Sequence, residues 1–205
     1  MPPDTRYVSR GGDKLRHALD VFALDPAGLV CADLGASTGG FTDCLLQAGA
    51  AKVHALDTAY GEFAWKLRNN PRVVLRERTN ALHAEPAEPV DLVVIDLGWT
   101  PQRLAIPAAL RCLKPPDNAG GPEATGEPGG RIISLVKPHY ELKDQKRPLP
   151  AGGVLDEALA EEVARACVDA LPAMGIRVLG LTRSPLLGGS KGKGNPEWLV
   201  LLARA

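Results

Sequence analysis

LVCADLGASTGGF, residues 29–41, is the stretch of sequence that decides the fold. Its first four residues are apolar without polar alternation, and Asp33, Gly35, Gly39 and Gly40 follow before a helical pattern begins. This order predicts a buried strand, a glycine turn and the start of a helix. At the carboxyl end of such a strand an α/β sheet binds nucleotide-like ligands, because the glycines admit a close approach and the helix offers free N–H groups.

The spacing of these glycines argues against two phosphate-binding turns. A dinucleotide fingerprint reads G-x-G-x-x-G, whereas this turn reads G-x-x-x-G-G from Gly35. A P-loop continues with Lys and Ser or Thr, whereas Phe41 and Thr42 follow here. The carboxylate of Asp33 suits a cationic or neutral ligand, such as the amino-acid part of S-adenosylmethionine, better than a pyrophosphate. Taken alone, the glycine turn of an unrelated α/β protein is an equal alternative.

The composition predicts one globular domain spanning residues 1–205. The chain is 45% hydrophobic, and its 24 basic and 24 acidic residues give a formal net charge of zero, which leaves room for a local basic face. It has no run of 18 apolar residues and no apolar signal core near the N-terminus, so we expect a cytoplasmic protein without a membrane partner. The four cysteines lie scattered in apolar sequence without a C-x-x-C pair, which predicts reduced core residues and no metal site.

Apolar runs predict six further strands, at residues 53–56, 73–75, 92–95, 131–136, 176–181 and 198–202. Helical periodicity marks residues 11–24, 40–48, 102–113 and 155–171. Alternating strands and helices that end in a hairpin predict a doubly wound α/β fold, with a seven-stranded mixed sheet and helices on both faces. We expect residues 1–27 to form a helical segment packed on this sheet. Residues 115–130, rich in proline and glycine, are expected to form a flexible insertion.

Polar residues follow several of the predicted strands at the same edge of the sheet. Asp57 closes the second strand about 20 residues after the glycine turn, where a carboxylate can accept hydrogen bonds from ribose hydroxyls. Asn80 follows the third strand and is placed to face an adenine. Asp96 closes the fourth strand, and Lys137 closes the fifth, where an ammonium group needs a partner because burying it unpaired is costly. Together these residues favour an adenosine-bearing cofactor.

Blocks spread along residues 6–203 resemble one protein family. In chain order they read YVSRGGDKLRHAL, DLGASTGGFTDCLLQAGAAKVHALD, WKLRNNPRV, ERTNA, LVVID, LVKP and KGNPEWL. Together they are similar to the FtsJ-type RNA 2′-O-ribose methyltransferases, and in particular to the TlyA-type (haemolysin A-like) rRNA methyltransferase group. The resemblance implies a Rossmann-like class I methyltransferase fold, S-adenosyl-L-methionine as cofactor, and RNA, above all ribosomal RNA, as partner.

The resemblance also implies a catalytic Lys-Asp-Lys-Glu tetrad, which maps onto Lys14, Asp96, Lys137 and Glu197. A ribose 2′-hydroxyl is a poor nucleophile, so a neutral amine must take its proton, and we assign this role to Lys137. A cation at Lys14 and partial desolvation would lower the pKa of Lys137, while acidic neighbours oppose this shift. The two carboxylates would orient the ammonium groups. No metal is needed. The predicted cofactor-binding residues are Asp33, Gly35, Ser37, Gly39, Gly40, Phe41, Asp57, Asn80 and Asp96.

Two departures from the TlyA-type pattern leave alternatives open. That group usually begins with a small RNA-binding S4 domain, for which the residues before Tyr7 leave no room. The segment LGWTPQ after Asp96 stands where the group usually has a Val-Ser-Phe pattern. One alternative is therefore a methyltransferase for another hydroxyl or a small molecule, and another is a non-catalytic RNA-binding protein on the same scaffold. An NAD-dependent dehydrogenase is less favoured, because its glycine fingerprint is missing.

Three groups of basic residues are expected at the rim of the pocket. They are Arg6, Arg10, Lys14 and Arg16; Lys143, Lys146 and Arg147; and Arg183, Lys191 and Lys193. If they converge, a chain without net charge can still present a positive face to RNA. Trp65, Trp99 and Trp198 are expected mainly in the core, with stacking on a base as the minor alternative.

Overall fold

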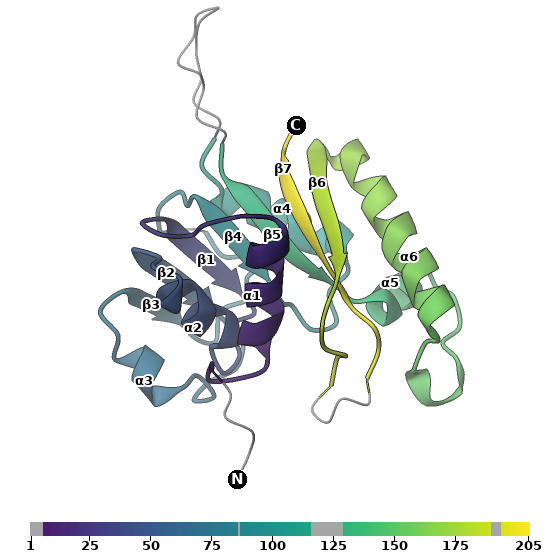
Figure 1. Ribbon diagram of the computed structural model, residues 1–205, viewed down its shortest axis with the longest axis horizontal. Helices are drawn as coiled ribbons and strands as arrows, with labels where there is room; N and C mark the ends of the chain where they lie inside the picture. The colour runs from purple at the N-terminus through teal and green to yellow at the C-terminus, as the bar shows by residue number, and fades with distance from the viewer. Residues whose placement is uncertain (1–5, 86, 116–128, 190–193) are drawn as a thin grey trace, which may run out of the picture.

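A mixed seven-stranded sheet with the strand order β3-β2-β1-β4-β5-β7-β6 forms the centre of the protein (Figure 1). The computed structural model describes residues 6–85, 87–115, 129–189 and 194–205. The strands are β1 (Val30–Leu34), β2 (Lys52–Leu56), β3 (Val73–Arg76), β4 (Leu92–Ile95), β5 (Arg131–Val136), β6 (Ile176–Arg183) and β7 (Trp198–Arg204). The first five are parallel, and β7 runs antiparallel to both β5 and β6. The predicted fold class and all seven predicted strands are confirmed.

Helices cover both faces of the sheet. They are α1 (Gly11–Val21), α2 (Gly40–Gln47), α3 (Trp65–Arg68), α4 (Gln102–Cys112), α5 (Pro138–Asp144) and α6 (Glu157–Ala170), with 3₁₀ turns η1 (Ala151–Gly153) and η2 (Leu171–Met174). Apolar side chains of α1 and α2 pack on one face, and those of α4, α5 and α6 pack on the other. In Figure 1, α1 accordingly crosses in front of the sheet while α4 lies behind it. Because the central strands are buried on both faces, their sequences are continuous apolar runs.

Each face of the sheet has its own hydrophobic core. On the first face Leu15 of α1 and Leu45 of α2 pack in one cluster with Leu92 of β4. On the second face Ile106 of α4 clusters with Ile132 of β5. All five side chains are completely buried, and burial of one such side chain contributes about 1.5–3 kcal/mol. The two cores therefore fix the helices that lie beside the carboxyl edge of the sheet.

Two short helices were not anticipated from the sequence. The polar segment 143–150 was expected to lie on the surface and it does, but its first two residues, Lys143 and Asp144, also form the end of α5. Pro138 occupies the first position of this helix, where its missing N–H costs nothing, and Leu142 is buried. α3 has only four residues and α5 only seven, so neither is long enough to show a clear hydrophobic period.

The remaining predictions concern the cysteines, the segment 115–130 and the absence of a membrane span. The four cysteines are free and buried, as expected. Most of the predicted insertion, residues 116–128, lies outside the described residues. In the parts of the chain that the structure describes, no helix combines the length and apolar character needed to cross a membrane.

The close approach of Gly35 to the Asp96 backbone can be tested by measuring the stability of alanine variants. Gly35 has a φ of +90°, and a Cβ there would lie 2.6 Å from the backbone oxygen of Asp96. A left-handed conformation costs an alanine about 1–2 kcal/mol, and the clash adds to this cost. Gly28 has a φ of +75° but open space around it, so it carries the conformational cost alone. We expect Gly35→Ala to lower the melting temperature clearly more than Gly28→Ala in thermal unfolding followed by circular dichroism, whereas equal losses would contradict the close approach.

Candidate active site

The four residues of the predicted tetrad meet at the carboxyl edge of the parallel strands. Asp96 directly follows β4 and Lys137 directly follows β5, and these two strands are parallel neighbours. β7 runs antiparallel to β5, and its register places Glu197, just before β7, beside Lys137. Lys14 reaches the same place from α1. Residues separated by up to 183 positions in the chain therefore line one cavity of about 780 Å³.

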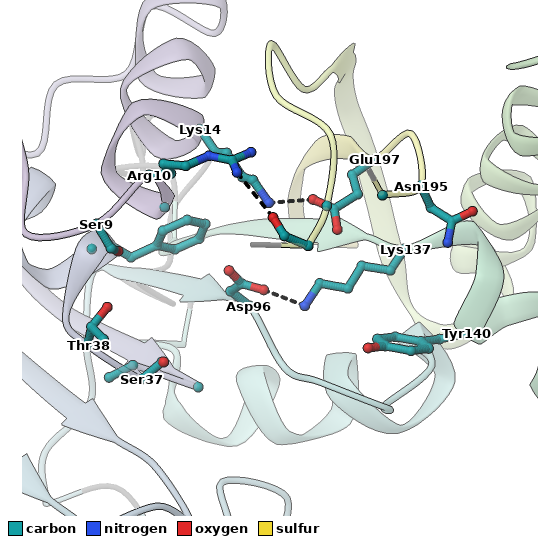
Figure 2. Close-up of a pocket in the computed structure, with 18 of the residues that line it drawn as sticks. Ser9, Arg10, Lys14, Ser37, Thr38, Asp96, Lys137, Tyr140, Asn195 and Glu197 are labelled. Carbon is teal, nitrogen blue, oxygen red and sulfur yellow. Dashed lines mark hydrogen bonds and ion pairs between the residues drawn. The ribbon is translucent and has the colours of Figure 1, made fainter. Parts of the chain in front are cut away.

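The tetrad forms two ion pairs (Figure 2). Lys14 Nζ lies 2.5 Å from Glu197 Oε2, and Lys137 Nζ lies 2.5 Å from Asp96 Oδ1. Lys137 Nζ also donates a hydrogen bond of 3.2 Å to the carbonyl oxygen of Leu97. The Lys14 and Glu197 residues are only 9% and 3% exposed, so this pair is shielded from water. Each carboxylate orients one ammonium group.

The electrostatics of Lys137 differ from the expectation. Burial alone lowers the pKa of Lys137, but the attraction and hydrogen bond of the Asp96 carboxylate outweigh it, and Glu197 adds further attraction. The pKa of Lys137 is therefore raised, and the prediction of a lowered pKa is wrong for the protein without ligand. For Glu197, burial raises the pKa, although the nearby Lys14 ammonium opposes this shift. The carboxylates of Asp96 and Glu197 thus set the direction of the shift in the Lys137 pKa.

A second cavity, of about 530 Å³, shares four lining residues with the first. The shared residues are Gly35, Ser37, Asp96 and Lys137. Asp57 and Asn80 line the second cavity only, and Asp57 accepts hydrogen bonds of 2.7 Å from the N–H groups of Ser37 and Ala59. Asp96 and Lys137 therefore stand where the two cavities meet, with the Asp57 carboxylate in the second.

Asp33 and Gly39 line neither of these cavities. Asp33 is 1% exposed, and its Oδ2 accepts a 2.6 Å hydrogen bond from the Thr42 hydroxyl. Its Oδ1 has no hydrogen-bond partner among the described residues. Burial raises the pKa of Asp33 to about 7. Gly39 has a φ of +97° and starts α2, where a Cβ would lie 2.5 Å from the Leu67 side chain.

The family model for FtsJ-like methyltransferase matches residues 7–204. The chain belongs to this family. It is 40% identical over 199 residues to the 16S/23S rRNA (cytidine-2′-O)-methyltransferase TlyA of Mycobacterium tuberculosis, an alignment that covers 96% of this chain and 68% of that protein. It is 32% identical to hemolysin A of Brachyspira hyodysenteriae, with 95% of this chain and 76% of that protein covered.

Solved structures agree with this assignment. A candidate hemolysin from Streptococcus thermophilus superposes with a TM-score of 0.84 at 34% identity, covering all of this chain and 70% of that chain. The N-methyltransferase NodS of Bradyrhizobium japonicum, at 15% identity and a TM-score of 0.57, shares the fold, with 96% of this chain and 98% of that chain covered. The predictions of the family, of the methyltransferase fold and of an enzyme are confirmed.

Several lining residues of this FtsJ-like methyltransferase were not singled out for the site, or were given another role. They are Ser9, Arg10, Thr38, His139, Tyr140 and Asn195. Arg10 was expected to contact RNA, but its guanidinium donates hydrogen bonds of 3.1 and 2.9 Å to the carbonyl oxygens of Gly189 and Leu187. It thus ties the start of α1 to the loop before β7 (Figure 2). The sequence held a signal for some of these residues, because Ser9 and Arg10 belong to the block that contains Lys14.

Exposed aromatic residues stand beside the tetrad. Trp99 is 77% exposed, and its ring centroid lies 5.1 Å from that of Tyr140. Lys143 Nζ lies 5.2 Å from the Trp99 ring. Trp65 is also exposed, at 76%, whereas Trp198 is buried. The expectation that the tryptophans lie in the core is therefore right only for Trp198.

The predicted basic face is largely paired with acidic or carbonyl groups. Arg16 pairs with Asp20, Arg147 with Glu162, and Arg183 with Glu157. Lys14 and Arg10 are engaged within the site, as described above. Lys191 and Lys193 lie outside the described residues. Among the expected basic residues, Lys143 stands beside the aromatic rings at the site.

The raised pKa of Asp33 predicts a pH-dependent stability. The folded protein keeps this proton up to a pKa of about 7, whereas an unfolded chain releases it near pH 3.9. Between these values the folded state binds more protons, so raising the pH favours unfolding, by about 1.4 kcal/mol for each pH unit at most.

We expect Asp33→Asn to become more stable relative to the wild type as the pH rises from about 4 through the Asp33 pKa of about 7, with the difference levelling off about one pH unit above that pKa. Asparagine can still accept the hydrogen bond from Thr42 but does not titrate. Urea unfolding of both proteins across this range measures the difference in unfolding free energy. A difference that does not vary with pH would show that Asp33 ionises normally.

Proposed function

We propose that this protein transfers a methyl group from S-adenosylmethionine to a ribose 2′-hydroxyl of ribosomal RNA. The observation that carries the proposal is the presence of two lysine–carboxylate ion pairs in one cavity, Lys14 with Glu197 and Lys137 with Asp96. The M. tuberculosis relative, named as an rRNA (cytidine-2′-O)-methyltransferase, supports the same acceptor. Membership of the FtsJ-like family supports the methyl transfer.

The residues around the second cavity fit S-adenosylmethionine, which would supply a methyl group on a positively charged sulfur. The Asp57 carboxylate is placed to accept hydrogen bonds from the ribose hydroxyls, and Asn80 is placed to face the adenine. Asp96 offers a carboxylate to a cationic group. The Oδ1 of Asp33, which has no partner among the described residues, is buried just before the glycine turn, and an intervening water would connect it to an ammonium group of the cofactor. Further proposed contacts are Gly35 and Ser37, which line both cavities, and Gly40 and Phe41, which line the first. Gly39 lines neither cavity and would contribute through the left-handed turn that it allows.

In this proposal Lys137 acts as the general base. Its Nζ takes the proton of the 2′-hydroxyl, and the resulting ammonium is held by Asp96 and by the Leu97 carbonyl. Lys137 must first be neutral, although Asp96 raises its pKa. Asp96 lines both cavities. A cationic ligand in the second cavity would therefore partly neutralise the Asp96 carboxylate and so lower the pKa of Lys137.

Lys14 and Glu197 would position the acceptor rather than take its proton. Glu197 fixes the Lys14 ammonium at 2.5 Å, so Lys14 can direct a second N–H toward the acceptor oxygen. Their low exposure excludes water from this side of the reacting atoms. Most of the barrier would then be lowered by holding the acceptor oxygen in line with the transferable methyl group.

The exposed ring of Trp99, with the half-buried ring of Tyr140 beside it, favours RNA over a small acceptor. Unstacked RNA bases commonly stack on aromatic side chains, and Lys143 beside Trp99 adds a positive charge for the phosphate backbone. Trp99 lines the second cavity and Tyr140 the first, but the 77% exposure of Trp99 lets its ring stack on a base that extends beyond both cavities, a contact that a small hydroxyl compound would not need. Methylation of a small acceptor is thus the second candidate, and a non-catalytic RNA-binding protein is the third.

Replacement of Lys137 tests the proposal. We expect Lys137→Ala to lower methyl transfer at least about 100-fold, because a general base contributes 10²–10⁴-fold, and to leave calorimetric binding of S-adenosylmethionine intact. Lys114→Ala is the matched control, because this exposed lysine pairs with Asp91 away from both cavities. Labelled cofactor and ribosomal subunits from cells that lack the protein provide the assay, and nuclease mapping locates the methyl group.

Three outcomes would contradict the proposal. Methyl transfer by Lys137→Ala at the wild-type rate would remove Lys137 as the base. A methyl group found on a base instead of the ribose would exclude the 2′-hydroxyl as acceptor. Transfer to a small hydroxyl compound, with none to RNA, would favour the second candidate function.

A further inference from the structure

One face of α5 is in contact with the segment that follows β4. The spacing i, i+3, i+4 and i+7 places four residues on one side of α5, starting at its N-cap: Lys137, Tyr140, Glu141 and Asp144. Their partners follow in the same order along residues 96–103. The contacts are Lys137 with Asp96, Tyr140 with Trp99, Glu141 with the backbone N–H of Gln102, and Asp144 with Arg103. The general base of the proposed reaction is thus the first member of a row of contacts.

Gln102, the first residue of α4, connects this row to the sheet. Its backbone N–H donates a 2.9 Å hydrogen bond to Glu141 Oε1 on α5. Its side-chain Nε2 donates a 3.1 Å hydrogen bond to the carbonyl oxygen of Leu135, and its Oε1 accepts a 2.6 Å hydrogen bond from the Ser134 hydroxyl. One residue therefore holds the chain both shortly before Lys137, on β5, and shortly after it, on α5.

These polar groups are buried, so their geometry is fixed. Gln102 is 3% exposed, Ser134 is completely buried, and Glu141 is 6% exposed. Leaving a buried polar group without its partner destabilises the folded state by about 1–3 kcal/mol, the cost of removing that group from water. Burial raises the pKa of Glu141, and the Gln102 N–H opposes this shift. The network therefore links the end of β5 to α5 through buried hydrogen bonds.

We propose that Gln102 is a positioning residue for Lys137, which holds both flanks of the lysine and thereby places its Nζ against Asp96. The inference rests on the proposed function only in taking Lys137 as the base. Gln102 lines neither cavity, and its hydrogen bonds reach Ser134, Leu135 and Glu141, the neighbours of Lys137 in the chain. Its effect is therefore expected on the placement of the base and not on the binding of the cofactor.

Gln102→Leu tests this role, because leucine keeps a similar size and the backbone N–H but removes both side-chain hydrogen bonds. We expect the maximal rate of methyl transfer to fall at least about 10-fold, while the KM for S-adenosylmethionine stays within about twofold of the wild type. Val53→Ala, in the core on the opposite face and on β2, is the control for lost stability alone. The control should keep the wild-type maximal rate at a temperature well below its melting point.

A second measurement does not depend on methyl transfer. The rate at which an amine-reactive reagent labels Lys137 can be followed by mass spectrometry as a function of pH, in the protein alone. Displacement of Lys137 from Asp96 should move the midpoint of this labelling to lower pH in Gln102→Leu but not in Val53→Ala. Ser134→Ala removes one of the two hydrogen bonds and should shift the midpoint in the same direction by less.

The two measurements separate the inference from the proposed function. Unchanged labelling and an unchanged maximal rate in Gln102→Leu would overturn the positioning role, as would a loss shared equally with Val53→Ala. Should Gln102→Leu fail to fold, Ser134→Ala decides by the same two criteria. Should the wild type transfer no methyl group to RNA while the labelling midpoint shifts as expected, the proposed function fails and the positioning role stands.

Discussion

The ion pair between Lys137 and Asp96 is the interaction on which the candidate site depends. An unpaired ammonium at the end of a central strand would be costly, because the surrounding protein excludes the water that would solvate it. The carboxylate that removes this cost also raises the pKa of the lysine, which works against its use as a base. Pairing therefore stabilises the protein without ligand, and in the proposed mechanism a cation that arrives near Asp96 lowers the pKa of Lys137 and so allows it to act as the base.

The sheet topology brings this pair and its neighbours together. β1 and β4 are adjacent in the sheet although β2 and β3 come between them in the chain, and ligands of open α/β sheets bind where the strand order reverses in this way. The antiparallel insertion of β7 beside β5 then adds Glu197 to the edge formed by the parallel strands. With α1 supplying Lys14 from one face and α4 supplying Gln102 from the other, the layers on both sides of the sheet contribute to one site.

Much of this arrangement could be predicted from the sequence, because strands buried on both faces are visible as apolar runs and the residues that follow them must share an edge. Asp57, Asp96 and Lys137 were placed by this reasoning alone, whereas Lys14 and Glu197 needed the family resemblance. Contacts that depend on short helices and loops were not predictable. The turn of α5 places Tyr140 and Glu141, and the loop before β7 meets Arg10, through contacts that leave no period in the sequence. For Asp33 the position on β1 was predicted correctly, but the sequence did not show that its side chain is buried and lines neither cavity.

The pH dependence of single-turnover methyl transfer tests the central claim most directly. With saturating S-adenosylmethionine, the wild-type rate should rise about tenfold per pH unit until Lys137 loses its proton. Asp96→Asn removes the charge that raises the pKa of Lys137, so its profile should level off at a lower pH, even though its maximal rate is reduced. A wild-type rate that does not vary with pH, or an Asp96→Asn profile displaced to higher pH, would contradict the account.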